Sequence, residues 1–286
     1  IKWIIMKQYK YRTTSKYSIE GLINNQVFFS GFEQFNDPFE FSNPMTDLSI
    51  YNLRAREELK RLYSDGVFSK ADYLHLLNAV KEPDQQMRES RLDLMNKISN
   101  GLHDFGVFCL SEVNDNILMW SHYGEDHKGF CIEFENLESH LETESLLIPV
   151  NYIEEFQDLN DPSPLISLYV EMFSNSKGLD QESWKRKYES LAKEITSKED
   201  RDLGIAVLGN KFVDWKYERE VRVISNTKGP LTYHSRAIKS IIFGLRMSDS
   251  DKRTIRNICD TEKLKHVTFK QARKKDSSFG IEIVDS

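Results

Sequence analysis

The sequence predicts an α+β fold in which a mostly antiparallel central sheet carries two helical insertions. Short alternating or β-branched segments recur near both ends and in the middle of the 286-residue chain, whereas residues of about 53–103 and 162–210 show helical periodicity. No internal repeat, low-complexity tract or Gly/Ser linker is present. A single domain over residues 1–286 is therefore the simplest expectation.

The first elements follow from alternation and capping signals. QYKYR at 8–12 alternates and predicts a strand, a helix is expected over 15–25, and QVFFS at 26–30 predicts a second strand. An aromatic loop rich in turn formers spans 31–41. The first insertion is then expected to contain three helices that end at glycine or proline or follow a serine cap: 52–66, 69–83 and 84–102.

The second half of the chain repeats this alternation of sheet and helix. The remaining strands are expected at 105–111, 128–135, 146–153, 218–225, 230–234, 238–244, 266–272 and 280–284. The remaining helices are expected at 116–124, 164–176, 180–198, 199–212 and 248–260, the last with a serine cap.

Composition excludes several broad classes. A net charge of −6 argues against a nucleic-acid-coating protein, although a local basic groove stays possible. The three cysteines are far apart, which favours buried thiols in a reducing compartment over a disulfide framework. No run approaches the roughly 18 apolar residues of a membrane span, and the apolar start is short for a signal peptide. We therefore expect a cytoplasmic protein without a membrane partner.

Several catalytic motifs are absent from the sequence. There is no G-x-x-x-x-G-K-S/T, G-x-G-x-x-G, G-x-S-x-G, H-E-x-x-H or C-x-x-C motif. His122 and His127 are close in sequence, but a spacing of five places them on different helix faces. We expect no metal site.

The segment KFVDWKYEREVRVI at 211–224 is the first candidate for chemistry. If it is a strand, four charged side chains share one face: Lys216, Glu218, Glu220 and Arg222. Two neighbouring carboxylates raise the cost of ionising both, and the flanking cations offset that cost. A surface salt-bridge ladder is the structural alternative, but the opposite, largely apolar face indicates burial and a fixed carboxylate pair.

Two N-terminal segments also combine polar and aromatic residues. On the strand YKYR, Lys10 and Arg12 share one face, and either an exposed cationic edge or a phosphate grip fits this pattern. In FNDPFE, Asn36, Asp37 and Pro38 signal a turn, yet Asp37 and Glu40 can instead project from this loop into a cleft.

The third candidate lies in NILMWSHYG. Trp120 and Tyr123 are three residues apart on one helix face, so they form either core packing or a stacking wall for a flat ring. His122 belongs to the same turn.

Taken together and in this order, YKYR, FNDPFE, MWSHYG…HKGFCIEF, WKYEREVRVI and IIFG resemble a bacterial family known as domain of unknown function 2971. The resemblance covers nearly the whole chain except the two helical blocks. Members often lie near phage-defence and abortive-infection genes, which implies an antiviral effector or toxin. The family label names no activity.

At the level of fold, the chain also resembles ADP-ribosyltransferase-like proteins, which use NAD as substrate. That resemblance implies a cationic first strand, a second strand with Tyr or Ser, and a catalytic Glu late on a strand. The expected catalytic residues are Glu220, Glu218 and Tyr123. The expected cofactor-binding residues are Arg12, Lys10, Trp120, His122, Asn36, Asp37 and Arg222. The sequence departs from the pattern in having no His on the first strand and a Tyr123 that reads as helical.

Two other classes of function stay open. A metal-dependent nuclease would use Asp37, Glu40, Glu218 and Glu220, although the order K-x-E-x-E differs from the usual E-x-K ending. A non-catalytic sensor or binding module would use the aromatic cleft. A partner protein docked on the helical insertions, and nucleic acid as acceptor of a transferred group, are further expectations.

Overall fold

The computed structural model describes residues 7–41, 48–80, 104–156 and 207–286, together with positions 161–163, 166, 167, 170, 171, 182, 183 and 186. The chain divides into two compact units. The first comprises Ile1–Phe41, Gly101–Glu154 and Gly209–Ser286, and the second comprises Ser42–Asn100 and Glu155–Leu208. The second unit is thus made of the two segments that overlap the expected insertions.

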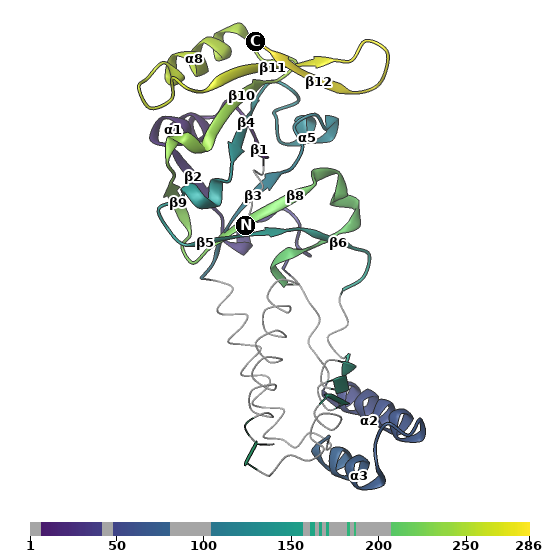
Figure 1. Ribbon diagram of the computed structural model, residues 1–286. Helices are drawn as coiled ribbons and strands as arrows, with labels where there is room; N and C mark the ends of the chain where they lie inside the picture. Colours follow the sequence, from purple (N-terminus) through teal and green to yellow (C-terminus); the bar gives the residue numbers. More distant parts are fainter. Residues whose placement is uncertain are drawn as a thin grey trace. The chain divides into compact units, whose positions relative to one another are not determined.

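The first unit is built on an eight-stranded sheet with the order β12-β11-β10-β4-β1-β3-β8-β5 (Figure 1). Neighbouring strands are antiparallel except β10 and β11, so the expected α+β class with a mostly antiparallel sheet is confirmed. The strands are β1 (Lys7–Arg12), β3 (Gly106–Ser111), β4 (Phe130–Glu135), β5 (Ser145–Pro149), β8 (Glu220–Ser225), β10 (Ile238–Phe243), β11 (Thr268–Lys274) and β12 (Ile281–Asp285).

Two small ribbons complete the strands of this unit. One is antiparallel and joins β2 (Gln26–Phe29) to β9 (Gly229–Thr232). The other is parallel and joins β6 (Asn151–Ile153) to β7 (Asn210–Phe212). The expected strand 146–153 is therefore divided between β5 and β6, which pair with different partners.

Helices cover both faces of the large sheet (Figure 1). The helices of this unit are α1 (Lys16–Asn24), α5 (Ile117–His122) and α8 (Asp249–Cys259), with the 3-10 turns η1 (Phe32–Gln34), η2 (Leu137–His140), η3 (Val213–Glu218) and η4 (Ser235–Ala237). The larger core joins α1, α8 and the β2–β9 ribbon to one face of the sheet. A smaller core joins α5 to Tyr9 and Tyr11 of β1 on the other face.

Strands β1 and β3 are neighbours that separate along their length. Their shared register pair is Tyr9 with Ser111, and further along Lys10 Nζ donates to the backbone carbonyl of Cys109 at 2.7 Å. Ser30, which follows β2, instead pairs with Val107 near the start of β3. The Lys10 side chain therefore lies between β1 and β3 where these strands separate.

The second unit contains α2 (Leu48–Ser64) and α3 (Lys70–Ala79), close to two expected helices. Ser69 caps α3 by accepting from the Asp72 amide, as its sequence position predicts. Buried side chains from both helices pack together with Phe68 and Ile166. The expected helix 84–102 lies outside the described residues, as do most of 164–176, 180–198 and 199–212.

One strand prediction is wrong in a way that shapes the site. Residues Val213–Glu218 form the 3-10 turn η3, and Arg219 follows in the left-handed conformation with φ 43°. Because this reversal ends the turn, the strand begins only at Glu220. Lys216 is exposed. The expected four-residue charged face along one strand does not form.

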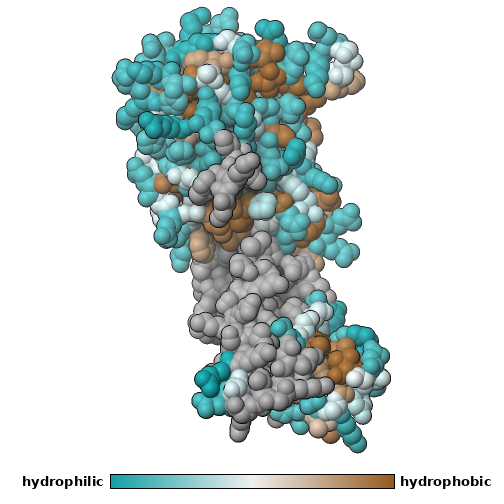
Figure 2. All heavy atoms as spheres, viewed as in Figure 1, coloured by the Kyte–Doolittle hydropathy of each residue, from teal (hydrophilic) through white to brown (hydrophobic). Residues whose placement is uncertain are grey.

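No helix in the described ranges is both long and apolar enough to cross a bilayer. On the face that Figure 2 shows, the described residues are mostly hydrophilic, with separate hydrophobic patches.

Candidate active site

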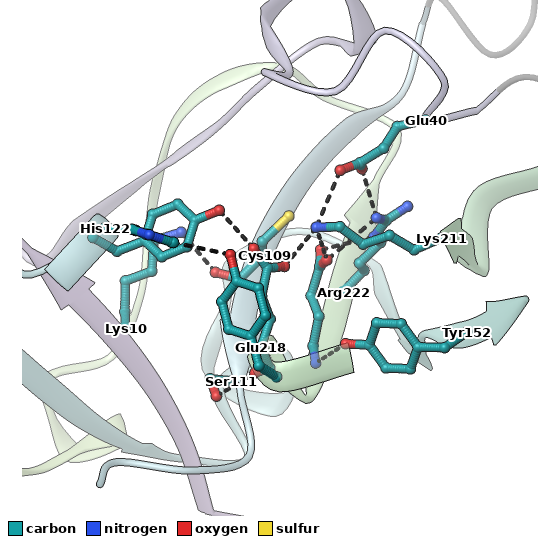
Figure 3. Close-up of polar contacts among 12 residues, drawn as sticks. Lys10, Glu40, Cys109, Ser111, His122, Tyr152, Lys211, Glu218 and Arg222 are labelled. Atoms are coloured by element: carbon teal, nitrogen blue, oxygen red, sulfur yellow. Dashed lines mark hydrogen bonds and ion pairs between the residues drawn. The ribbon is translucent and has the colours of Figure 1, made fainter. Parts of the chain in front are cut away.

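The ammonium of Lys211 lies at the point where three carboxylates converge (Figure 3). Its Nζ is 2.5 Å from Glu218 Oε2, 2.8 Å from Glu220 Oε2 and 3.1 Å from Glu40 Oε1. The first two contacts are hydrogen bonds, whereas the third is an ion pair without hydrogen-bond geometry. All four residues are buried. Lys211 comes from β7, Glu218 from the end of η3 and Glu220 from the start of β8.

Arg222, two residues after Glu220 on β8, supplies the second cation. Its Nε donates to Glu220 Oε1 at 2.8 Å and its Nη2 donates to Glu40 Oε2 at 2.6 Å. The side chain is fully buried, and its guanidinium lies 4.8 Å from the ring centroid of Phe41. Glu40, which follows an aromatic turn far away in sequence, is thereby fixed against the sheet.

Burial and ion pairing compete for each charge in this cluster. Burial would raise the pKa of Glu220, but its pairs with Arg222 and Lys211 outweigh that effect and lower the pKa to about 2. Burial would lower the pKa of Lys211, but the three carboxylates raise it. For Glu40 burial prevails, so its pKa is raised. When all are ionised, the three carboxylates are in ion pairs with two cations, so the ion-paired cluster itself carries one excess negative charge, and the Lys10 ammonium lines the same cavity without an ion pair to it.

Tyr123 joins the cluster through Glu218. Its hydroxyl donates to Glu218 Oε1 at 2.6 Å, and its pKa is raised by burial and by this hydrogen bond. The two residues meet because Asn116 both caps α5 and donates its side-chain amide to the Tyr217 carbonyl in η3. The capping residue thus docks the helix that precedes Tyr123 onto the turn that ends at Glu218.

Backbone contacts fix the turn between the two acids. The amide of Glu220 donates to the hydroxyl of Tyr152 at 2.7 Å, and the Ser111 hydroxyl donates to the carbonyl of Glu218 at 2.6 Å (Figure 3). These bonds hold the backbone on both sides of Arg219. The carboxylates therefore have a defined position before any ligand binds.

The cluster forms one side of a small cavity. The cavity has a volume of about 130 Å³, and its polar lining includes Lys10, Glu40, Ser111, Tyr123, Lys211, Glu218 and Glu220. A neighbouring cavity of about 390 Å³ shares Asn36 and Tyr123 with it and is otherwise lined by His122, Asp214, Trp215 and Tyr217. A carboxylate-lined space thus adjoins an aromatic one.

His122 and Tyr217 form a pair within this aromatic cavity. His122 Nδ1 and the Tyr217 hydroxyl are 3.0 Å apart, and their ring centroids are 5.8 Å apart. His122 is exposed, so this pair lies at the solvent side of the cavity.

The structure brings together Glu218, Glu220, Tyr123 and Arg222 of the expected site, and it places Asn36 and His122 at the adjoining cavity. Lys10 also lines the carboxylate cavity. Arg12 lines a separate cavity of about 530 Å³ that Lys10 shares. Lys10, and not Arg12, is the N-terminal cation next to the acids.

Two expected binding residues have other roles. Trp120 is fully buried, packs edge-to-face against Tyr11 at 5.1 Å and donates Nε1–H to the Asn114 carbonyl. It belongs to the core beneath α5, so of the two expected alternatives, core packing and a stacking wall, the first applies to Trp120. Asp37 is buried and accepts the Phe39 amide, which is the turn role that Asn-Asp-Pro signals.

The sequence interpretation missed Lys211 and Tyr152, and it connected Glu40 with a cleft or a metal site but not with an ion pair to Arg222. Both missed residues reach the acids because β6 and β7 pair in parallel, with Tyr152 opposite Lys211. Nothing local in the sequence signals that pairing. The lysine at the expected position, Lys216, is exposed, whereas the lysine five residues earlier is buried.

Within the described residues, no group of three or more His, Cys, Asp or Glu side chains is arranged to hold a metal ion. The point where the three carboxylates converge is taken by the Lys211 ammonium, and Asp37 is engaged in its own turn. The residues present therefore do not fit the metal-dependent nuclease alternative.

These features define an α+β protein with a buried carboxylate–cation cluster beside an aromatic cavity. A model of the family described as protein of unknown function (DUF2971) matches residues 119–223. The matched stretch contains Tyr123, Tyr152, Lys211, Glu218, Glu220 and Arg222. This match supports the resemblance to that family. No curated protein and no solved structure matches the chain.

Proposed function

We propose that the protein is an NAD-consuming enzyme, either an ADP-ribosyltransferase or an NAD glycohydrolase. The observation that carries this proposal is the position of Glu218 and Glu220, two buried carboxylates fixed by Lys211 at a cavity that Tyr123 also lines. Preorganised groups of this kind stabilise charge that develops during a reaction better than water does.

Cleavage of the nicotinamide glycosidic bond suits the charge of the cluster. The C1′–N bond breaks, its electron pair passes to the nicotinamide nitrogen, and the ribose develops oxocarbenium character. The excess negative charge of the cluster stabilises that cation. The hydroxyl of water or of another acceptor then forms the new bond at C1′, and its proton passes to a carboxylate.

The two acids are suited to different roles. Both oxygens of Glu220 lie in ion pairs with Lys211 and Arg222, so it is a positioning residue. Glu218 has one oxygen on Lys211 and the other on the Tyr123 hydroxyl. A ligand that displaces this hydroxyl exposes a carboxylate oxygen, so we assign the reacting carboxylate to Glu218.

The order of strands is consistent with the resemblance to ADP-ribosyltransferase-like proteins. Strand β3, which ends at Ser111, lies between β1, which carries Lys10, and β8, which begins at Glu220. A cationic strand, a strand with Ser and a strand with Glu thus follow one another in space. The His122–Tyr217 cavity next to Tyr123 offers aromatic surface for the nicotinamide ring.

The test is release of nicotinamide from NAD by the purified protein, with and without cell extract as a source of acceptor. Glu218→Gln is expected to lower release at least 100-fold, and Glu112→Gln, at an exposed ion pair with Arg219, is expected to leave it unchanged. Transfer of labelled ADP-ribose to protein or nucleic acid distinguishes a transferase from a glycohydrolase. Absence of release under both conditions contradicts the proposal.

An antiviral effector role is the biological part of the proposal, and it rests on the resemblance to the family found near phage-defence genes. Expression in bacteria is then expected to arrest growth and deplete NAD, and Glu218→Gln is expected to abolish both effects. A protein partner on the second unit would keep the enzyme inactive before infection. Its removal is expected to raise NAD consumption.

A non-catalytic binding module is the second candidate. This alternative is favoured because both carboxylate oxygens of Glu220 already have cationic partners. In that case the aromatic cavity binds a small molecule without turnover. Growth arrest that persists in the Glu218→Gln variant, with NAD intact, would support this alternative.

A further inference from the structure

The largest of the three cavities described above lies on the other face of the sheet from the carboxylates. Its volume is about 530 Å³, within the range of small-molecule sites. Its apolar wall comes from the core that joins α1 to the sheet, including Leu22, Phe108 and Phe134, whereas the carboxylate cavity borders the core of Tyr9 and Tyr11.

Two cations line this cavity from the same strand. Lys10 and Arg12 are two residues apart on β1, and both lie over the ring of Phe108, with charge-to-centroid distances of 4.7 Å and 5.7 Å. Among the described residues, neither cation is within 4.0 Å of a carboxylate. The acid among the lining residues, Glu20, is half exposed and pairs with Lys16 at 3.7 Å.

This arrangement is unfavourable for the empty protein. Burial and the neighbouring Arg12 lower the pKa of Lys10 to about 8, and burial also lowers the pKa of Arg12. The Lys10 ammonium donates to the Cys109 carbonyl, and the charges of Glu218 and Glu220 favour it only from beyond ion-pair distance. An anion bound between Lys10 and Arg12 would stabilise both cations directly. The planar guanidinium of Arg12 matches phosphate oxygens, and the Lys10 ammonium adds a second donor.

Aromatic side chains stand at the rim of the same cavity. Tyr17 on α1 is 84% exposed and Phe28 on β2 is 50% exposed, although both line the cavity. Pro230, which pairs with Phe28 across the β2–β9 ribbon, extends this apolar rim. Exposed rings next to the two cations, Lys10 and Arg12, are suited to a ligand that has both a flat ring and an anionic group.

We propose that this cavity is a binding site for a mononucleotide, with the phosphate between Lys10 and Arg12 and the base against Tyr17 and Phe28. The enclosed volume fits one such molecule, whereas a nucleic-acid strand needs an extended basic groove. The site lies on the opposite face from Glu218 and Glu220. Lys10 lines both cavities, whereas Arg12, Tyr17 and Phe28 line this one and not the carboxylate cavity. Binding at this site does not depend on the protein being an NAD-consuming enzyme.

Isothermal titration with AMP tests the proposal. The comparison ligands are ribose 5-phosphate and inorganic phosphate, which lack the base, and adenosine, which lacks the phosphate. AMP is expected to bind at least tenfold more tightly than each of them. Arg12→Gln and Phe28→Ala are each expected to weaken AMP binding at least tenfold. The matched controls are Lys16→Gln, an exposed cation on α1 outside the lining, and Glu218→Gln, which removes the proposed reacting carboxylate; both are expected to retain full affinity.

Folding is checked by thermal unfolding of the same variants. Arg12→Gln is expected to keep or raise the midpoint, because it removes repulsion with Lys10, so its loss of affinity will not reflect misfolding. Absence of AMP binding at millimolar concentration overturns the proposal. So does an equal loss of affinity in Lys16→Gln, or tighter binding of single-stranded oligothymidine than of AMP.

Discussion

Lys211 Nζ lies 2.5 Å from Glu218 Oε2, and the same ammonium contacts Glu220 and Glu40. One buried cation therefore holds carboxylates from two segments that are far apart in the chain, one with Glu40 and one with Glu218 and Glu220. Buried charges are costly unless they are paired, so each member of this cluster depends on the others.

Replacement of the central cation is expected to be strongly destabilising. Lys211→Met leaves three buried carboxylates with Arg222 alone, and we expect the free energy of unfolding to fall by about 3–5 kcal/mol. Lys216→Met, at an exposed lysine in the adjacent turn, should change it by about 0.5 kcal/mol or less. Denaturant unfolding measures both values. Equal stability of the two variants would show that Lys211 does not hold the cluster together.

The sheet was predictable because its signals are local. The expected strands at 8–12, 128–135 and 238–244 lie within two residues of β1, β4 and β10 at each end, and the serine caps at Ser69 and Ser248 coincide with helix starts. Each signal lies within a few residues of the element that it specifies.

The site was predictable only in part because its geometry depends on non-local pairing. Glu218 and Glu220 are adjacent in sequence and were expected together, but the left-handed Arg219 and the β6–β7 pairing that delivers Lys211 leave no local pattern. Trp120 shows a related ambiguity. A helical Trp–x–x–Tyr spacing fits both a core and a ligand wall, and only the packing of Tyr11 against Trp120 decides between them.

The two tryptophans near the site are expected to respond differently to truncation. Trp120→Ala removes a fully buried side chain and should lower the free energy of unfolding by about 3–5 kcal/mol. Trp215→Ala, at a partly buried residue that lines the aromatic cavity, should cost about 1 kcal/mol or less but weaken nicotinamide binding. Denaturant unfolding and nicotinamide titration separate the effects. Loss of binding in a well-folded Trp120 variant, with Trp215→Ala unaffected, would reverse this assignment.

Removal of the Tyr123 hydroxyl tests its hydrogen bond to Glu218. Tyr123→Phe keeps the ring but leaves Glu218 Oε1 without this donor. A hydrogen bond to a charged group contributes about 1.5–3 kcal/mol, so we expect nicotinamide release to change by about 10- to 100-fold. Tyr63→Phe, on α2 in the second unit, is the matched control. A change in the unfolding midpoint without a change in turnover would make Tyr123 a structural residue.

Acid should weaken the cluster through Glu220. Its pKa is about 2 in the folded protein against an ordinary value near 4.5, so the ionised form is favoured by folding. The stabilisation is present above pH 4.5 and is lost as the pH falls towards 2, because the folded protein must then protonate a carboxylate held by Arg222 and Lys211. Glu40, whose pKa is raised by burial, takes up its proton earlier, which leaves Arg222 to Glu220 and Lys211 to Glu218 and Glu220.

The clearest measurement is the difference in free energy of unfolding between the protein and its Glu220→Gln variant across pH 2–7. Near neutral pH the variant should be less stable by about 3–5 kcal/mol, since Lys211 and Arg222 lose a shared partner. The difference should narrow as the pH falls below 4.5. Glu133, whose pKa is lowered to about 2 by hydrogen bonds from Lys270 and Ser240 that outweigh its burial, destabilises both proteins equally in acid and cancels in the difference. A difference that stays constant from pH 7 to pH 2 would mean that Glu220 is not ionised in the folded protein, and the charge balance on which the proposed chemistry rests would be wrong.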